Sequence, residues 1–230
     1  MNLTAEKCSV TGLWHIPELE HWADTFRGMI DNLQEGRNFK FARYGDGEIH
    51  CMRGRDAVNC DNHYYYPDLG AALRQTIATE PDYMVGIQPL SIGSLSQQVK
   101  EYFGHFQRLY NADVLHNASI ERRIPEFFRA LKGRYVILVG PYHLAGLFND
   151  HIHIVIPHVD CWKQHEEIRQ QIAFHIDGIV NPVVLLCASM MSEVIISEFE
   201  DAHATFIDCG SVFDPYVGVK SRKYHHNLAV

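Results

Sequence analysis

Two uninterrupted apolar segments constrain the fold of this chain more than any other feature. They lie at residues 135–139 and 183–188, and a glycine or a serine follows each at once. A strand with one face in water alternates apolar and polar residues, whereas a strand covered on both faces is apolar throughout. Such strands occur in parallel sheets with a layer of helices on each side. The sequence therefore predicts an α/β fold.

The remaining elements fit the same architecture. Further strands are expected at residues 39–42, 83–87, 151–158 and 204–208, with a short one at 114–115. Helices are expected at residues 17–33, 68–79, 94–106, 120–131, 162–176 and 189–200. This alternation predicts a single Rossmann-like domain, a mostly parallel sheet with right-handed crossovers and helices on both faces. Within the 230 residues, we expect residues 1–16 to form a loose arm and residues 209–230 an ordered tail over the site.

Charge, apolar length and cysteine spacing argue against several classes of protein. The net charge of −8 disfavours a protein that coats polyanions, which needs clustered lysine and arginine. No apolar stretch is long enough to cross a bilayer, and the first residues lack the order of a secretion signal. We therefore expect a cytoplasmic protein without membrane insertion. The six cysteines include no Cys-x-x-Cys pair, which argues against a zinc cage.

The most informative polar segment follows the strand expected at 39–42. Gly45-Asp46-Gly47-Glu48 places two carboxylates where that strand ends, which is where ligands bind in open α/β sheets. The glycines let the backbone approach a ligand closely, and carboxylates are hard oxygen ligands for a divalent cation. Arg43 can balance the acids or hold a phosphate. Alternatively, the acids only form a turn and cap the following helix.

Residues 43–48 resemble the Arg-aromatic-Gly-Asp-Gly-Glu signature of the GT-D-type glycosyltransferases. Residues 136–141, 206–211, 214–216 and 221–222 are similar to the same family, so the resemblance spans roughly residues 39–224. It implies a metal-dependent enzyme that moves a hexosyl or pentosyl group from a nucleotide-diphosphate sugar, expected to be a UDP-sugar, to a hydroxyl acceptor. It also implies that Asp46 and Glu48 hold Mn²⁺ or Mg²⁺, and that the donor contacts Arg43, Tyr44, Gly45 and Gly47.

Other polar residues are candidates for the donor site because parallel strands end at one edge of the sheet. Gln88 follows the strand expected at 83–87, and Ser189 opens a helix whose free amide groups can bind an anion. Arg222 lies in a basic run that either closes over the diphosphate or is a solvated tail.

The acceptor hydroxyl needs a general base if the reaction inverts configuration. Asp214 is the candidate base. Asp208 ends the last expected strand, and it is either a catalytic residue near the metal or a structural one that caps the turn at Gly210-Ser211.

The run Tyr64-Tyr65-Tyr66 is the candidate acceptor site. Three consecutive rings cannot all face one core, and an exposed ring stacks well on a sugar or a base. Alternatively, the rings only cover the side of the sheet.

A glycan or glycoprotein acceptor suits the acidic charge of the chain. The alternative acceptor is a nucleobase in DNA, which would need a basic groove. Its candidates are Arg53, Arg55, Lys132, Arg134 and residues 220–223. Two other classes would use the same acids: a metal-dependent phosphate hydrolase and a noncatalytic nucleotide-binding module.

Overall fold

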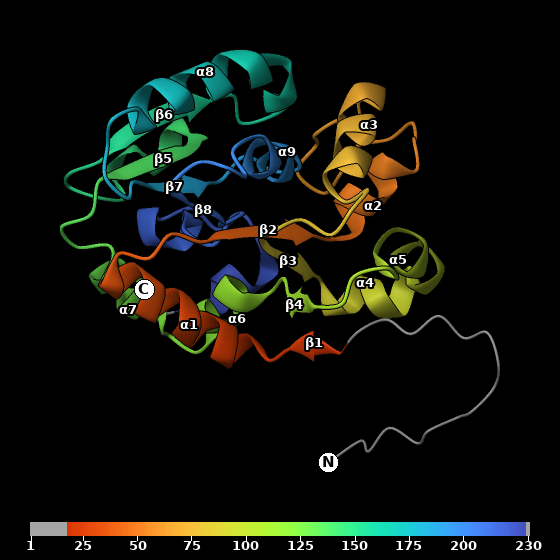
Figure 1. Ribbon diagram of the computed structural model, residues 1–230, viewed down its shortest axis with the longest axis horizontal. Helices are drawn as coiled ribbons and strands as arrows, with labels where there is room; N and C mark the ends of the chain where they lie inside the picture. Colours follow the sequence, from red (N-terminus) through yellow and green to blue (C-terminus); the bar gives the residue numbers. More distant parts are fainter. Residues whose placement is uncertain (1–17, 229–230) are drawn as a thin grey trace.

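A parallel sheet forms the centre of the computed structural model, which describes residues 18–228. In that part of the chain eight strands pair in parallel in the order β1-β4-β3-β2-β8-β7-β5-β6 (Figure 1). The predicted parallel sheet is confirmed, and the arm expected at residues 1–16 lies outside the described residues. The strands are β1 (Leu19–Glu20), β2 (Lys40–Tyr44), β3 (Met84–Ile87), β4 (Leu109–Asn111), β5 (Val136–Pro141), β6 (Ile152–Ile156), β7 (Val183–Leu186) and β8 (Thr205–Asp208).

Helices cover both faces of the sheet (Figure 1). One face carries α2 (Asp46–Met52), α3 (Pro67–Thr76), α5 (Ser96–Phe103), α8 (His165–Ile176) and α9 (Met191–Glu198). The other carries α1 (Trp22–Glu35), α6 (Val114–Ile120) and α7 (Ile124–Ala130). Short helices complete the chain: α4 (Pro89–Ser94), η1 (Tyr142–Gly146), η2 (Cys161–Gln164), η3 (Asp214–Val217) and η4 (Lys223–Asn227). Across residues 18–228, no helix is long and apolar enough to cross a bilayer.

The packing of β7 explains why its sequence is apolar throughout. Val183 and Leu185 pack with α1, α6 and α7, whereas Val184 and Leu186 pack into the cluster on the other face. All four are fully buried. Successive side chains of a strand point to opposite faces, so two helical layers require apolar residues at every position.

The strand predicted at residues 114–115 is wrong. The strand is β4, which ends at Asn111, and the helix α6 starts at residue 114. The Oδ1 atom of Asn111 accepts the amide of Asp113 at 2.8 Å, and this turn takes the chain out of the sheet. The two apolar residues then pack against α1 from within a helix. Two adjacent apolar residues do not distinguish a short strand from a helical turn.

Two helices also begin elsewhere than predicted. The helix α1 starts after His21, whose Nδ1 accepts the amide of Ala23 at 3.3 Å, because β1 occupies the residues before it. The helix expected at 94–106 is two helices, since Leu95 leaves helical geometry with φ −126° and ψ 36°. Pro89 opens α4, where its missing N–H costs no hydrogen bond.

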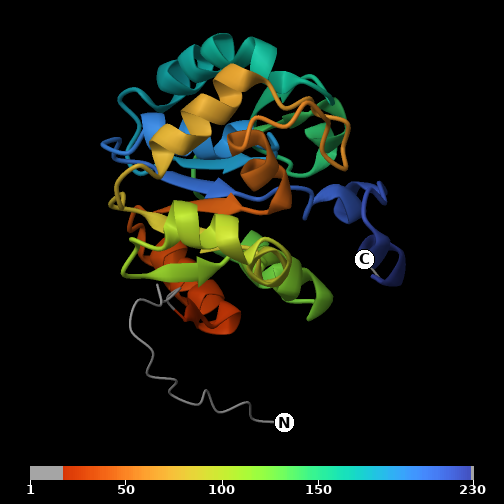
Figure 2. The ribbon, with the colours of Figure 1, turned by 90° about the vertical axis from the view of Figure 1, so that its right-hand side faces the viewer.

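The strand order creates a switch point at the centre of the sheet. The chain moves from β2 outward to β3 and β4, whereas β7 and β8 fill the space between β5 and β2. After β2 the chain packs on one face as α2 and α3, and after β8 it packs on the other. In Figure 2 the strand arrows point toward the side on which α2 and the C-terminal tail (residues 209–228) lie. Ligands of open α/β sheets bind at such a point.

A substitution at Gly70 of α3 tests how closely α3 packs against α2. A Cβ atom at Gly70 would overlap the backbone carbonyl of Cys51 in α2, so Gly70→Ala must push the two helices apart. We expect the free energy of unfolding to fall by about 1–3 kcal/mol. The matched control is Gly28→Ala in α1, where nothing lies within 4 Å of the new Cβ and alanine should add about 0.5–1 kcal/mol. Denaturant titration measures both values, and equal effects would contradict the tight contact between α2 and α3.

Candidate active site

A cavity of about 580 Å³ lies along the carboxyl edge of the sheet. Residues that follow β2, β3, β4, β5, β6, β7 and β8 line it, together with residues 221–224 of the C-terminal tail. Its volume is within the usual range for small-molecule sites. Among the predicted site residues it is lined by Arg43, Tyr44, Gly45, Asp46, Gly47, Glu48, Gln88, Ser189, Asp208, Asp214 and Arg222.

Asp46 presents an exposed carboxylate to this cavity. It is the first residue of α2, and its Oδ1 accepts the amide of Gly47 at 3.0 Å. That single contact leaves the carboxylate oxygens with capacity for further partners, because a carboxylate has about four acceptor positions. Asp46 therefore fits a cation ligand.

Glu48 lies deeper and has a structural contact of its own. Its Oε2 accepts the amide of Gly45 at 2.7 Å, so the carboxylate caps the start of α2. Burial, only partly opposed by this amide, raises the pKa of Glu48 to about 7. Glu48 therefore makes the helix-capping contact that the sequence offered as the alternative to cation binding. A cation beside it would favour its charged form.

Arg43 is held between acids. Its Nε donates to the carbonyl of Ala112 at 2.9 Å, and its Nη1 lies 3.9 Å from Oδ1 of Asp208. Burial opposes the charge, but Asp208 and Asp113 nearby more than offset it and raise the pKa of Arg43. A Cβ at Gly210 would overlap Nη1, so glycine at that position makes room for the guanidinium.

Asp208 and Glu193 form a buried acidic pair in the lining of the cavity. Oδ1 of Asp208 accepts a hydrogen bond from the amide of Gly210 at 2.9 Å. Asp208 therefore caps this turn, which is one of the two roles expected for it. Oε2 of Glu193 is buried and has no hydrogen-bond partner among residues 18–228. Burial and the neighbouring Glu48 and Asp208 raise the pKa of Glu193 well above its ordinary value. Burial likewise raises the pKa of Asp208, against the effect of Arg43.

Sequence reasoning missed Glu193. The signal was present, since an acid interrupts the apolar residues of α9, whose first six residues are all buried. A buried acid in an apolar helix is informative because carboxylates are seldom buried without a partner.

Gln88 and Ser189 both lie at the cavity, as expected from the parallel sheet. The Oε1 atom of Gln88 accepts the hydroxyl of Ser91 at 3.3 Å. Oγ of Ser189 accepts a hydrogen bond from Nδ2 of Asn59 at 3.1 Å, and its backbone has φ +50°. A non-glycine residue in this left-handed region is strained.

Arg222 links the C-terminal tail to the segment after α2. Both terminal nitrogens of its guanidinium donate to the carboxylate of Asp61. This ion pair, together with stacking of Tyr224 on His116 with ring centroids 3.9 Å apart, holds residues 221–224 at the cavity.

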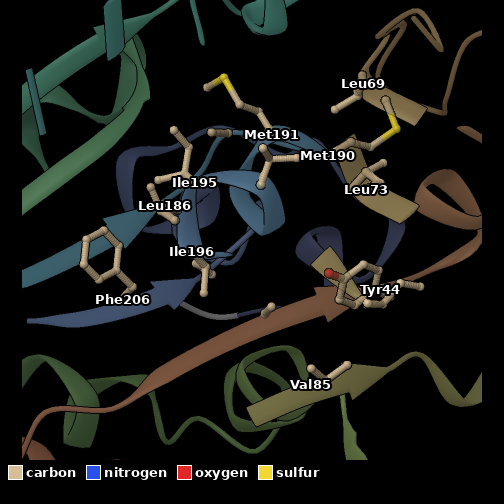
Figure 3. Packing of buried hydrophobic residues seen from close by; sticks show 14 of the residues in the cluster. Tyr44, Leu69, Leu73, Val85, Leu186, Met190, Met191, Ile195, Ile196 and Phe206 are labelled. Carbon is tan, nitrogen blue, oxygen red and sulfur yellow. The ribbon is translucent and has the colours of Figure 1, made fainter. Parts of the chain in front are cut away.

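The ring of Tyr44 points into the core. It is therefore not placed to contact a donor in the cavity. The ring is fully buried among residues of α3 and α9 (Figure 3), and its hydroxyl lies 2.6 Å from that of Thr76. Packing against Phe103, with ring centroids 5.3 Å apart, holds it there. Tyr44 is the last residue of β2, and its side chain points to the face of the sheet that the helices cover.

The three consecutive tyrosines do not line the cavity. Tyr65 is buried, and the hydroxyl of Tyr64 donates to Asp56 at 2.8 Å. Tyr64 and Tyr66 pack edge to face with ring centroids 5.0 Å apart. These positions fit the alternative in which the rings only cover the side of the sheet.

Asp214 is buried in a network that spans the cavity wall and the tail. Its Oδ1 lies 2.9 Å from Nε2 of His143, and its Oδ2 accepts the hydroxyl of Ser221. The same hydroxyl lies 3.5 Å from Nδ1 of His225, which is fully buried. Sequence reasoning missed His143 because 71 positions separate it from Asp214, and only the fold brings the two together.

The charge of the lining favours a cation as part of any phosphate site. Seven carboxyl groups line the cavity against three lysine and arginine side chains, and both arginines already face acids. In the described part of the chain, no group of three or more His, Cys, Asp and Glu side chains could hold a metal without other ligands. A cation at Asp46 and Glu48 would need further ligands, such as phosphate oxygens or water, as Mg²⁺ commonly has.

The basic residues considered for a DNA groove do not share a face. Arg134 precedes β5, at the amino edge of the sheet, and donates to the carbonyls of Leu33 and Asn181. Residues 221–224 lie at the opposite, carboxyl edge.

Solved structures share this fold, although no family model and no curated protein matches the sequence. A structure described as a new glycosyltransferase from Streptococcus sanguinis, of domain of unknown function 1792, is 19% identical with a TM-score of 0.65. The match covers 83% of this chain and 81% of that one. A second structure, described as showing that this domain has a distinct glycosyltransferase fold, is 16% identical over 83% of this chain and 78% of that one, with a TM-score of 0.64. This chain has that glycosyltransferase fold. The shared fold confirms the predicted architecture, in which the cavity occupies the carboxyl edge.

The raised pKa of Glu48 makes a prediction about stability. The folded protein binds this proton more tightly than the unfolded chain, so the stabilising effect is complete below the ordinary pKa of 4.5 and is lost as the pH rises through about 7. Glu48→Gln keeps an oxygen for the Gly45 amide and does not ionise. We expect it to match the wild type at pH 4 and to be more stable at pH 8 by on the order of 1 kcal/mol, allowing for partial solvent exposure.

Denaturant titration with EDTA from pH 4 to 8 tests this prediction. Glu167→Gln, at an exposed position in the first turn of α8, is the control. Parallel curves of the free energy of unfolding against pH for the wild type and Glu48→Gln would contradict a raised pKa of Glu48 in the folded protein.

Proposed function

We propose that this protein is a metal-dependent glycosyltransferase that moves a hexosyl or pentosyl group from a nucleotide-diphosphate sugar, in the first place a UDP-sugar, to a hydroxyl acceptor. The observation that carries the proposal is the position of Asp46. Its exposed carboxylate lies two residues after the end of the central strand β2, at the switch point, and lines the cavity of a glycosyltransferase fold.

Asp46 would hold Mn²⁺ or Mg²⁺ directly, and Glu48 would support it from the first turn of the same helix. When bound, the cation neutralises the diphosphate and stabilises the charge that develops on it as the bond to the sugar breaks. The protein supplies too little positive charge for this alone, because Arg43 and Arg222 already face Asp208 and Asp61.

Arg43 has a positioning role in this proposal. Asp208 and the Ala112 carbonyl hold its guanidinium at the lining, so that it faces the cavity without a change of rotamer. Such preorganised charge acts on a transition state without further reorganisation. Gln88 and Ser189 offer polar groups at the ends of β3 and β7, on either side of Asp46.

The acceptor that we propose is a glycan or a glycosylated protein. The cavity lining and the whole chain carry excess negative charge, which repels a polyanion such as DNA. Uncharged sugars bear many hydroxyl groups and bind without such repulsion.

Removing the carboxylate charge at position 46 tests the proposal. With Asp46→Asn, we expect the affinity for UDP in the presence of Mn²⁺ to fall at least tenfold and release of nucleoside diphosphate from a UDP-sugar to fall at least a hundredfold, because the cation loses its exposed ligand. Calorimetry with and without EDTA and a coupled release assay with an added glycan measure the two effects.

Asp31→Asn, the same change on the exposed side of α1, is the control and should match the wild type. Nucleotide binding that ignores both EDTA and Asp46→Asn would refute the cation site. Sugar release that is independent of any acceptor would instead identify a hydrolase.

A further inference from the structure

We propose that His143, held by Asp214, accepts the proton of the acceptor hydroxyl, and that the transfer consequently inverts the configuration of the sugar. This inference rests on the proposed glycosyltransferase function and assigns its general base. It replaces Asp214 in that role with the histidine that Asp214 positions.

Asp214 itself is poorly placed to meet an acceptor. The residue is only 6% exposed, and each of its carboxylate oxygens already has a partner. One oxygen faces Nε2 of His143 and the other accepts the Ser221 hydroxyl. A base must reach the proton that it removes, and this buried carboxylate is engaged at both of its oxygens.

His143 lines the cavity and is hydrogen-bonded to the Asp214 carboxylate. The residue belongs to η1, directly after the end of β5, and 25% of its side chain is exposed. With Nε2 donating to Asp214, the imidazole is in the tautomer whose Nδ1 carries a lone pair. No hydrogen bond within the described residues occupies Nδ1, so this nitrogen remains able to accept a proton.

The groups around the ring leave Asp214 as its one close acid among the described residues. His158, from the segment after β6, packs edge to face with ring centroids 5.9 Å apart, and His153 of β6 is the next titratable neighbour. Pro141 and Cys187 line the cavity beside it. A histidine held by one buried carboxylate is the arrangement that general bases commonly use.

The position of His143 along the sheet edge separates the base from the cation site. Three strand spacings, roughly 14 Å, lie between the ends of β2 and β5. The donor sugar and the acceptor hydroxyl lie between them in this proposal, with the diphosphate on the Asp46 side. A base on the far side of the sugar from the leaving group matches attack opposite to the departing bond.

The proposed step balances as follows. Nδ1 of His143 takes the hydroxyl proton while the acceptor oxygen forms a bond to the anomeric carbon. The bond from that carbon to the phosphate oxygen breaks, and its electron pair leaves with the nucleoside diphosphate. Asp214 stabilises the imidazolium that results, which later releases its proton to solvent.

Three variants separate this role from a structural one. His143→Gln keeps a donor for Asp214 and lacks a basic nitrogen. Asp214→Asn removes the charge that stabilises the imidazolium. Ser221→Ala removes the hydroxyl contacts to Asp214 and His225 and leaves the contact between His143 and Asp214 in place.

The chain also offers a matched control in His165. Its Nε2 lies 2.9 Å from Oε2 of Glu198, the same distance as in the pair of His143 and Asp214, but His165 is not among the residues that line the cavity. His165→Gln should therefore leave activity unchanged.

The experiment measures kcat and KM against pH with a glycan acceptor, UDP affinity by calorimetry, and the anomeric configuration of the product by NMR. For His143→Gln we expect kcat to fall by roughly 10²–10⁴-fold, UDP affinity to stay within about threefold, and the acid limb of the wild-type pH profile to disappear. Asp214→Asn should lower kcat and alter the same limb, Ser221→Ala should cost far less, and the product should be inverted.

Three results would overturn the inference alone: His143→Gln with kcat close to the wild type, a product of retained configuration, or Ser221→Ala with the same defect as Asp214→Asn. The last would show that Asp214 acts through the tail. A wild-type protein that neither binds nor cleaves a nucleotide sugar would overturn the proposed function as well, and this separates the two failures.

Discussion

One short contact organises the site: the Gly45 amide donates to the carboxylate of Glu48. It ends β2 and begins α2 within four residues, and so it turns the chain off the central strand at the switch point. Asp46 is the first residue of that helix and is exposed only because the turn is this tight. Gly45 fits because Gln88 and the Glu48 carboxylate lie 3.1 Å and 3.3 Å from where its Cβ would be. The capping role and the functional role of this motif are therefore parts of one structure.

Around this contact the site concentrates negative charge. Glu48, Glu193 and Asp208 share a small volume with a single guanidinium, that of Arg43, and burial raises the pKa of all three acids. Such a cluster is costly without a counter-charge, because close carboxylates oppose one another's ionisation. A cation at Asp46 would relieve part of this repulsion. Ser189 at this edge has a positive φ, and Oε2 of Glu193 has no hydrogen-bond partner among the described residues.

The sequence predicted what local chemistry determines. The apolar segments around Leu138 and Leu185 revealed buried parallel strands, and the placement of Asp46 after β2 followed from the way such sheets end. The strand at β4 was missed because three residues carry too little periodicity, and two apolar residues beyond it were taken for it. Long-range partners were the other gap. That His143 meets Asp214, and that the Tyr44 ring meets Thr76, depends on where distant elements pack, which no local pattern encodes.

The space between Arg43 and Gly210 links two positions that lie far apart in the chain. The guanidinium occupies the volume into which any side chain at 210 would project, and the backbone there has φ +52°. A side chain at 210 would require the Arg43 guanidinium to move, and this movement would disturb its ion pair with Asp208. The conformation of Arg43, and with it the counter-charge of Asp208, therefore depends on the absence of a side chain at position 210.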